Sequence, residues 1–207
     1  MQSDEQLIEA WRSGQTEAGE VLFERYYDGV YRFFCNKLGQ DIRDLVQQTF
    51  VACVEGRDRL REGASFRSYL FAVAHNVLRL HLRARYRPEL LDLDTVTAHE
   101  LAPGPSSILM RSREERLLLH ALRSIPLEQQ MLLELRYWEQ LSSPEIAEVL
   151  GVPDNTVRSR LHRAHASLKA AMERLADSPD ELASTLDNLD EWARRCRAQL
   201  VEQPTDT

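Results

Sequence analysis

Apolar residues recur three or four positions apart through almost the whole chain, and this spacing restricts the fold more than any other feature of the sequence. One example is the run Leu22, Tyr26, Val30 and Phe33. No stretch shows the sustained apolar–polar alternation that a half-buried strand requires. Amphipathic helices are stable only when their apolar stripes pack against one another. We therefore predict an all-α fold.

In the first half of the chain the spacing predicts four helical segments, which can close one bundle, and a buried stripe is identified in each of the last three. Asp41 is expected to open the third segment and Ser65 to cap the fourth. The predicted stripes are Val21, Leu22, Tyr26, Val30, Phe33 and Phe34; then Ile42, Leu45, Val46, Phe50, Cys53 and Val54; and then Phe66, Tyr69, Leu70, Val73, Val77 and Leu80.

A segment rich in proline and acid divides the predicted helices into two groups. Residues 88–107 contain three Pro, one Gly and four acids but no Lys or Arg, which predicts an exposed, flexible acidic linker. We expect one small helical domain on each side of this linker, at 1–87 and at 108–175. Residues 176–207 predict one further amphipathic helix, whose apolar stripe is Leu182, Leu186, Leu189, Trp192, Cys196 and Leu200.

Charge is spread unevenly along the chain. The formal net charge is −7, which by itself disfavours nucleic acid as a partner. Residues 57–87, however, contain eight Arg against two acids, and a second basic cluster runs from Arg158 to Lys169. Polyanion binding depends on the local field and not on the net charge. The two clusters are therefore either nucleic-acid contacts or solvated basic faces.

Other classes of protein are disfavoured by what the sequence lacks. No apolar run approaches the ~18 residues that span a bilayer, and the first residues lack the order of a signal peptide. Cys35, Cys53 and Cys196 are far apart and form no metal or disulfide pattern. Phosphate-loop, nucleophile-elbow and metalloprotease motifs are missing. We expect a cytoplasmic protein with no catalytic site, cofactor, metal or membrane insertion.

The stretch from Leu141 to Leu168 predicts a helix-turn-helix. Ser143 is expected to cap the first helix, with Pro144 at its first position, and Gly151 to end it in a left-handed turn. The second helix, from Asp154 to about Lys169, buries Val157, Leu161, Ala164 and Leu168. Arg, Ser and His on its outer face can reach base edges or phosphates. The candidate DNA-contacting residues are Asn155, Thr156, Arg158, Ser159, Arg160, His162 and Arg163.

Three motifs together resemble one known family. DIRDLVQQTF at 41–50 resembles region 2.2 of the sigma-70 family, and FRSYLFAVAHNVLRLHLRAR at 66–85 is similar to its regions 2.3 and 2.4. Residues 122–164 resemble region 4. The order of these blocks and the linker between them resemble the extracytoplasmic-function (ECF) group of bacterial transcription initiation factors. On this resemblance, 1–87 is region 2 and 108–175 is region 4.

The resemblance implies partners and roles for particular residues. Core RNA polymerase, through its β′ and β subunits, and promoter DNA are the expected partners, and an anti-sigma factor is a further candidate. Region 2.2 docks on a coiled coil of β′, which assigns that contact to Asp41, Asp44, Gln47 and Gln48. Arg158, Ser159, His162 and Arg163 are expected to read the minus-thirty-five element.

Regions 2.3 and 2.4 of the family melt the minus-ten element and hold its unpaired strand. Asn76 stands where the family has an Asn thought to hold a flipped base, and phosphate contacts are expected from Arg79, Arg83 and Arg85. Tyr69 and Phe71 are the nearest aromatic residues, but Tyr69 follows the predicted core stripe. His75 replaces a common Arg, and Leu80-His81 replaces the usual Asp-His, so the preferred minus-ten sequence stays open.

Three hypotheses for the function of the chain remain at this stage. The chain is either a sigma factor or a stand-alone helix-turn-helix regulator whose N-terminal bundle senses a ligand or dimerises. A regulator of that kind binds a palindromic site without polymerase. A simple protein-interaction bundle is the third hypothesis.

Residues 176–207 have two possible roles of their own. They form either one more packed helix or a built-in regulator that masks a basic DNA surface or touches polymerase.

Overall fold

The computed structural model describes residues 2–60, 65–86, 92–102 and 113–175. Within these ranges every regular element is a helix, apart from one isolated bridge between Thr97 and Pro126. The predicted all-α fold is therefore confirmed. The elements are α1 (Asp4–Arg12), α2 (Thr16–Cys35), α3 (Ile42–Glu55), the short η1 (Arg57–Arg59), α4 (Phe66–Arg85), α5 (Ala98–Leu101), α6 (Arg113–Arg123), α7 (Leu127–Tyr137), α8 (Ser143–Leu150) and α9 (Asp154–Leu175).

Helices α1 to α4 enclose a core made largely of aromatic rings. Trp11 packs edge-on against Phe23 and Phe66, with ring centroids 5.5 and 6.2 Å away, and Phe23 lies 4.7 Å from Phe50. Gly19 allows this approach, because a Cβ atom there would meet the Trp11 indole nitrogen at 2.5 Å. Edge-to-face and offset rings of this kind favour a single arrangement of the core.

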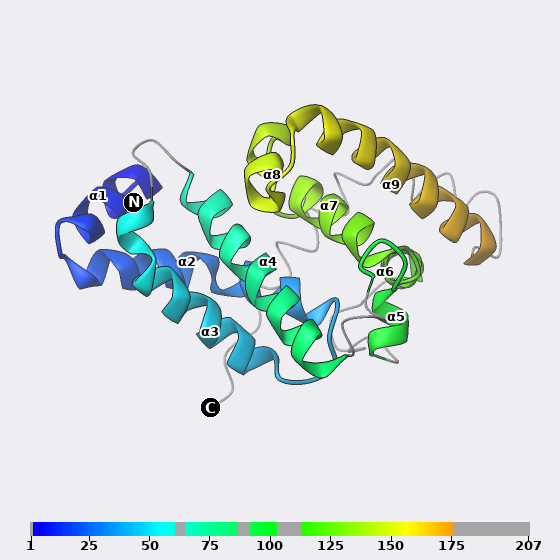
Figure 1. The fold of residues 1–207 in the computed structure, drawn as a ribbon, viewed down its shortest axis with the longest axis horizontal. Coiled ribbons are helices and arrows are strands. Elements are labelled where there is room, and N and C mark those ends of the chain that lie inside the picture. Colours follow the sequence, from blue (N-terminus) through cyan, green and yellow to red (C-terminus); the bar gives the residue numbers. More distant parts are fainter. Residues whose placement is uncertain (1, 61–64, 87–91, 103–112, 176–207) are drawn as a thin grey trace.

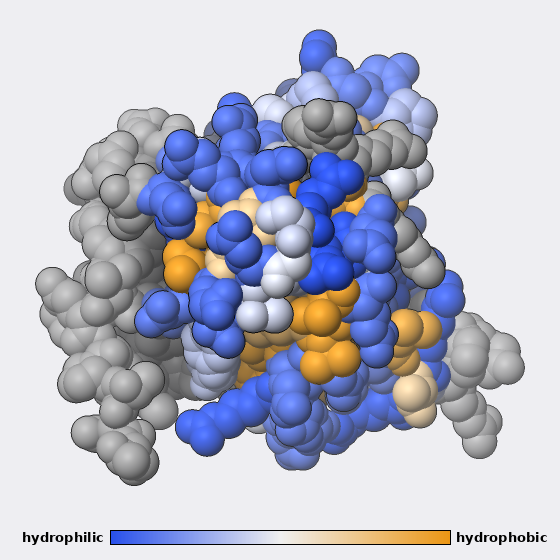
Figure 2. Space-filling view, turned by 90° about the vertical axis from the view of Figure 1, so that its left-hand side faces the viewer, coloured by the Kyte–Doolittle hydropathy of each residue, from blue (hydrophilic) through white to orange (hydrophobic). Residues whose placement is uncertain are grey.

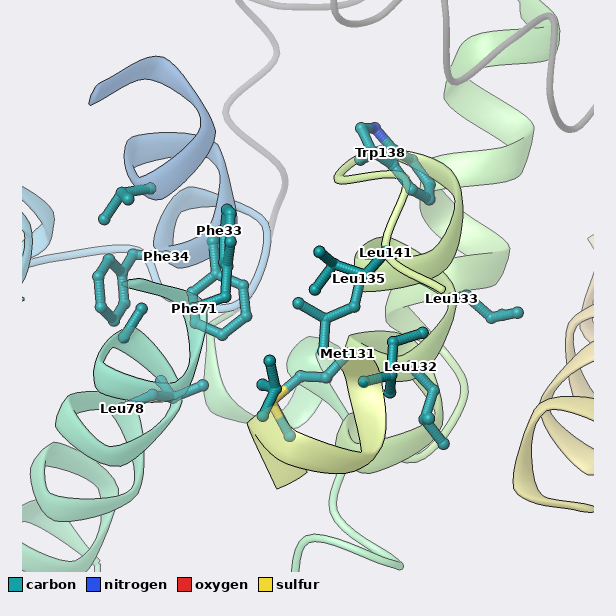
Figure 3. Close-up of a cluster of buried hydrophobic side chains, with 14 of the residues drawn as sticks. Phe33, Phe34, Phe71, Leu78, Met131, Leu132, Leu133, Leu135, Trp138 and Leu141 are labelled. Atoms are coloured by element: carbon teal, nitrogen blue, oxygen red, sulfur yellow. The ribbon is translucent and has the colours of Figure 1, made fainter. Parts of the chain in front are cut away.

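Helices α6 to α9 pack around an aliphatic core, which includes the fully buried Leu118, Leu122, Ile146 and Ala164. The two cores are continuous: Phe33 and Phe71 of the first half face Met131 and Leu135 of the second (Figure 3). The helix-turn-helix is formed by α8 and α9.

The start of α8 differs by one residue from the prediction. Ser142, not Ser143, is the N-cap, and it forms a capping box with Glu145. Gly151 ends α8 with φ 67°, in the left-handed conformation that was predicted. The second helix continues to Leu175, beyond the predicted end near Lys169, because Ala171 and Met172 extend its buried stripe.

Helix α4 lies between the two halves, with α3 on one side and α8 on the other (Figure 1). Phe71, Ala74, Leu78 and Leu82 are fully buried as a result. The predicted burial of Leu80 is wrong, since it is 65% exposed. Because α4 has neighbours on two sides, its buried surface is wider than one stripe and is centred elsewhere. The predicted burial of two further residues, Val21 and Val54, is also wrong.

Part of the segment predicted to be an exposed linker is packed. The carbonyls of Leu93 and Val96 accept hydrogen bonds from the backbone of Glu128 (3.1 Å) and Leu127 (2.8 Å) at the start of α7. Ala98 is fully buried. The apolar residues that alternate with the acids in this segment account for the difference. Residues 87–91, 103–112 and the predicted C-terminal helix at 176–207 lie outside the described residues.

Candidate nucleic-acid interface

Most of the candidate DNA-contacting residues of the helix-turn-helix are exposed to solvent on the outer face of α9. Five of the seven are exposed, namely Asn155, Arg158, Ser159, His162 and Arg163, whereas Thr156 and Arg160 are half-buried. The side chain of Arg158 is 70% exposed and pairs with Asp154 one turn earlier, at 2.8 Å. The predicted inward row of Val157, Leu161, Ala164 and Leu168 is buried. An exposed cationic face braced by a partner helix is the form of a recognition helix.

Arg160 is held by an acid of the same half. Its guanidinium forms an ion pair with Glu128 of α7. Burial and a hydrogen bond with Asp94 raise the pKa of Glu128 to about 7, against the opposing effect of the Arg160 charge. Asp94, Glu128, Arg160 and Arg163 line one cavity of about 290 Å³. Any phosphate contact by Arg160 therefore competes with these acids.

The candidate DNA-contacting residues on α4 lie on a helix that has neighbours on two sides and is therefore less exposed than α9. Asn76, Arg83 and Arg85 are exposed, and Arg79 is half-buried. Arg85 pairs with Asp41 at 3.0 Å, which joins a candidate phosphate contact to a candidate polymerase contact.

The two aromatic residues near this site belong to the packing of the first half. Phe71 is fully buried, with its ring 5.8 Å from that of Phe33. The Tyr69 hydroxyl donates a hydrogen bond to the Cys53 carbonyl at 3.3 Å, and the side chain is half-buried. The expectation that Tyr69 packs with the core agrees with this contact.

His75, which replaces a common Arg of the family pattern, is a buried neutral side chain. It is 7% exposed. Burial, with smaller effects of the Arg79 and Lys37 charges, lowers the pKa of His75 to about 4. It lines a second cavity of about 290 Å³ together with Arg79, Arg83, Asp92, Leu93, Asp94, Glu128 and Leu150.

The cavities bring the two sets of cations to the same acids. Arg79 and Arg83 of α4 share one cavity with Asp94 and Glu128, and Arg160 and Arg163 of α9 share the other with the same two acids. Sequence reasoning placed Asp94 in an exposed linker and did not single out Glu128. Nothing in the local sequence pattern indicates this contact, because its residues come from four separate segments.

The candidate polymerase contacts lie at the N-cap and on the first turns of α3, beside an apolar groove that the sequence did not predict. Asp41, Asp44, Gln47 and Gln48 are exposed. Gln47 also lines a groove of about 410 Å³ between α2 and α3, with Phe23, Tyr27, Arg43, Val46, Phe50, Val51 and Val54. Val51 and Val54 are each 49% exposed. Figure 2 shows apolar patches among hydrophilic side chains at this end of the molecule.

Metal-binding groups and membrane-spanning helices are both absent from the described residues. No group of three or more His, Cys, Asp or Glu side chains there is arranged to hold a metal ion. Among the same residues, no helix is both long enough and apolar enough to cross a bilayer.

Both halves of the chain match families of known proteins. Residues 22–87 match sigma-70 region 2, and residues 115–168 match sigma-70, region 4. The ECF RNA polymerase sigma-E factors of Salmonella typhimurium and Escherichia coli are each 27% identical over 176 residues. These matches cover 80% of this chain and 92% of each relative.

Solved structures share the arrangement of helices. CnrH, in complex with the cytosolic domain of CnrY, matches with a TM-score of 0.62 and 25% identity, over 84% of this chain and 99% of that one. RpoE of Bartonella quintana, in complex with the anti-sigma factor NepR, has the same fold, with a TM-score of 0.56 and 19% identity over 76% of this chain and 95% of that one. The chain therefore belongs to the sigma-70 family of transcription initiation factors, in its ECF group.

Proposed function

We propose that this chain joins core RNA polymerase in the bacterial cytoplasm, directs it to promoters and initiates transcription there without a catalytic site of its own. The observation that carries the proposal is the pair of matched regions, each with its own helix of DNA-contacting candidates. A stand-alone regulator is not favoured, because a protein that acts without polymerase does not require sigma-70 region 2. We assign 1–87 to region 2, 88–107 to the linker and 108–175 to region 4.

Helix α9 reads the upstream element as duplex DNA. The exposed guanidinium of Arg158 makes paired hydrogen bonds to guanine, and Ser159, His162 and Arg163 contact neighbouring base edges or phosphates. Asn155 and Thr156, at the start of the helix, contribute through the N-terminal turn, where backbone N–H groups favour phosphate.

Helix α4 holds the unpaired strand of the downstream element. Asn76 is exposed and available to a flipped base, while Arg79, Arg83 and Arg85 follow the backbone phosphates. Tyr69 and Phe71 contribute packing and not base stacking, because their contacts lie within the first half.

The two halves must separate to bind both elements at once. Elements centred near minus ten and minus thirty-five are about 25 base pairs apart, or roughly 85 Å of B-form duplex. In the structure described here α4 packs directly against α8 of the helix-turn-helix. A linker between the halves then raises the effective concentration of the second contact once the first has formed.

The polymerase contact lies on α3. The exposed acids and amides of Asp41, Asp44, Gln47 and Gln48 bind a helical coiled coil of β′ through charge-assisted hydrogen bonds. The apolar groove beside them, with Val51 and Val54, adds burial of apolar surface to this contact. RpoE is a relative solved with an anti-sigma factor, and we propose a regulator of the same class for this chain.

In vitro transcription from a promoter library, with core polymerase and with or without this chain, tests the function. We expect transcripts only when the chain is present, from asymmetric sites with two elements. Transcription that does not depend on the chain contradicts the proposal. Tight binding of the free chain to a palindrome supports the regulator instead.

Replacement of one α9 residue tests the assignment of upstream recognition. Arg158→Ala is expected to weaken binding to the selected upstream element by about 1–3 kcal/mol and to relax specificity there. Lys169→Ala, which removes an exposed cation farther along α9, is the matched control. Equal transcription by the Arg158 variant from selected and scrambled upstream elements rules the assignment out.

A further inference from the structure

A cluster of charged and amide side chains is buried where the two halves meet. Lys37 follows α2 and has no exposed surface. Its ammonium group donates to the Phe33 carbonyl at 2.7 Å and forms an ion pair with Glu134 of α7. Glu134 also accepts hydrogen bonds from Asn36 (3.3 Å) and Gln130 (2.9 Å). The carboxylate thus binds three partners, two of them from the opposite half.

Two further contacts join the halves in the same way. Arg32 of α2 pairs with Glu139, which follows α7, at 2.8 Å, and both side chains are 10% exposed. Arg123 of α6 donates to the Asn36 carbonyl at 2.5 Å, beyond the end of α2. A cation there is favourable, because the C-terminal end of a helix carries partial negative charge.

Buried ion pairs of this kind are unusual in an interface that stays permanently closed. A buried ion pair contributes little more than well-packed apolar residues, since the cost of removing two charges from water offsets most of their attraction. Its groups regain hydration when the halves part, whereas an apolar interface exposes surface that water disfavours. Loss of one partner alone leaves an unpaired buried charge, which is strongly destabilising. These properties suit an interface that opens.

The closed arrangement also occupies two candidate DNA contacts of α4. Arg79 and Arg83 line a cavity with Asp94 and Glu128. The Arg160–Glu128 pair lies within the second half and does not depend on closure. Carboxylates stand there where DNA phosphates would bind. A closed chain therefore presents fewer free cations to DNA than an open one.

We propose that Lys37, Glu134, Arg32 and Glu139 form a reversible ionic lock. It holds the free chain closed, with Arg79 and Arg83 of α4 facing the acids Asp94 and Glu128, until polymerase binding opens it. The inference rests on the proposed function for the identity of the DNA contacts. The contacts that close the lock are properties of the free chain.

The first test removes one charge of the lock. In Glu134→Gln the amide keeps the shape of the side chain but leaves Lys37 buried beside a neutral partner. We expect a larger radius of gyration in small-angle X-ray scattering. We also expect affinity for a random-sequence duplex of about 20 base pairs, measured by fluorescence anisotropy, to rise about tenfold as the open fraction grows.

Asp4→Asn is the matched control. It also changes an ion-paired carboxylate to an amide, but the pair that it breaks, with Arg25, lies within the first half. The control is expected to keep both the scattering and the duplex affinity of the unchanged chain. If Glu134→Gln behaves like Asp4→Asn while circular dichroism shows both variants folded, the lock is overturned.

A second variant tests the lock in the opposite direction and does not depend on Glu134→Gln folding. Lys37→Met combined with Glu134→Leu replaces the pair with apolar side chains of similar size. We expect this chain to stay closed, with unchanged duplex affinity, and to support transcription with core polymerase at least about fivefold less well. Transcription equal to that of the unchanged chain overturns the proposal.

The two levels of inference fail separately. If the unchanged chain starts no transcription with core polymerase, the proposed function is wrong, although the scattering and duplex measurements still decide whether a lock exists. If the unchanged chain is active, while Glu134→Gln changes neither scattering nor duplex affinity and the double variant transcribes normally, only the lock is wrong.

Discussion

Helices α9 and α4 both carry candidate DNA contacts, yet they differ in how much of their surface is free. Helix α9 packs along one side and leaves Arg158, His162 and Arg163 exposed. Helix α4 packs on two sides and buries Phe71 and His75. On the proposed function, the duplex-contacting face of α9 is therefore already exposed in the closed chain, whereas the strand-contacting face of α4 becomes accessible only when the halves part.

The largest expected effect tests whether α4 is enclosed. Phe71→Ala should lower the free energy of unfolding by about 3–5 kcal/mol, because it leaves a cavity between α4 and α2. Leu80→Ala, on the same helix but 65% exposed, should change it by less than about 0.5 kcal/mol. Urea unfolding measures both. Similar values for the two variants would mean that α4 is as open as α9.

The second test uses the low pKa of His75. In the folded chain the pKa is about 4, against 6.5 for an ordinary His, so between these values the unfolded chain binds a proton that the folded chain does not. The His75 contribution to stability should therefore fall as the pH decreases from about 6.5 to 4, by on the order of 3 kcal/mol in full. Glu128, whose pKa is raised to about 7, contributes in the opposite direction over a similar range, so the His75 effect is the difference between the unchanged chain and a His75 variant. Urea unfolding at several pH values measures that difference.

Two variants isolate the His75 effect. Relative to the unchanged chain, His75→Gln should gain stability as the pH decreases through this window, whereas His120→Gln, which changes an exposed imidazole on α6, should follow the unchanged chain. An unchanged slope in the His75 variant would show that this side chain is not the group responsible and that α4 is less enclosed than described.

The smallest effect concerns the helix that braces α9. Ser142→Ala should cost about 1 kcal/mol, because the hydroxyl no longer accepts the Glu145 backbone hydrogen bond. Ser143→Ala, one residue later, should fall within about 0.5 kcal/mol. Thermal unfolding of the two single variants distinguishes them. A larger loss of stability in Ser143→Ala than in Ser142→Ala would show that Ser143 is the N-cap, as the sequence predicted.

The comparison of α9 and α4 also explains which parts of the molecule the sequence could predict. A helix with one packed side follows a single stripe, so Val157, Leu161 and Ala164 were predicted correctly. Local pattern cannot reveal a second neighbour, and this accounts for the error at Leu80. The Ser142 cap was missed by one residue, because two adjacent serines offer the same side chain and only the backbone conformation selects between them.

Contacts between distant segments were not predictable in the same way. Lys37 and Glu134 are 97 positions apart, and each alone resembles an ordinary surface charge. The packing of residues 92–102 was hidden by composition, since Pro and acid outweighed the few apolar residues that dock. The family match predicts the roles of α4 and α9 but not the closed arrangement that relates them.

Arg123 has a consequence for local motion. Its guanidinium donates to the carbonyls of Asn36, Ala98 and Ala102, which belong to two segments remote from α6. A planar group with donors at fixed angles satisfies all three at once, and Lys cannot. The Arg123 side chain thus holds the end of α2 and helix α5 against α6, so that the two segments open together. In Arg123→Lys, amide hydrogen exchange should therefore become faster in both segments.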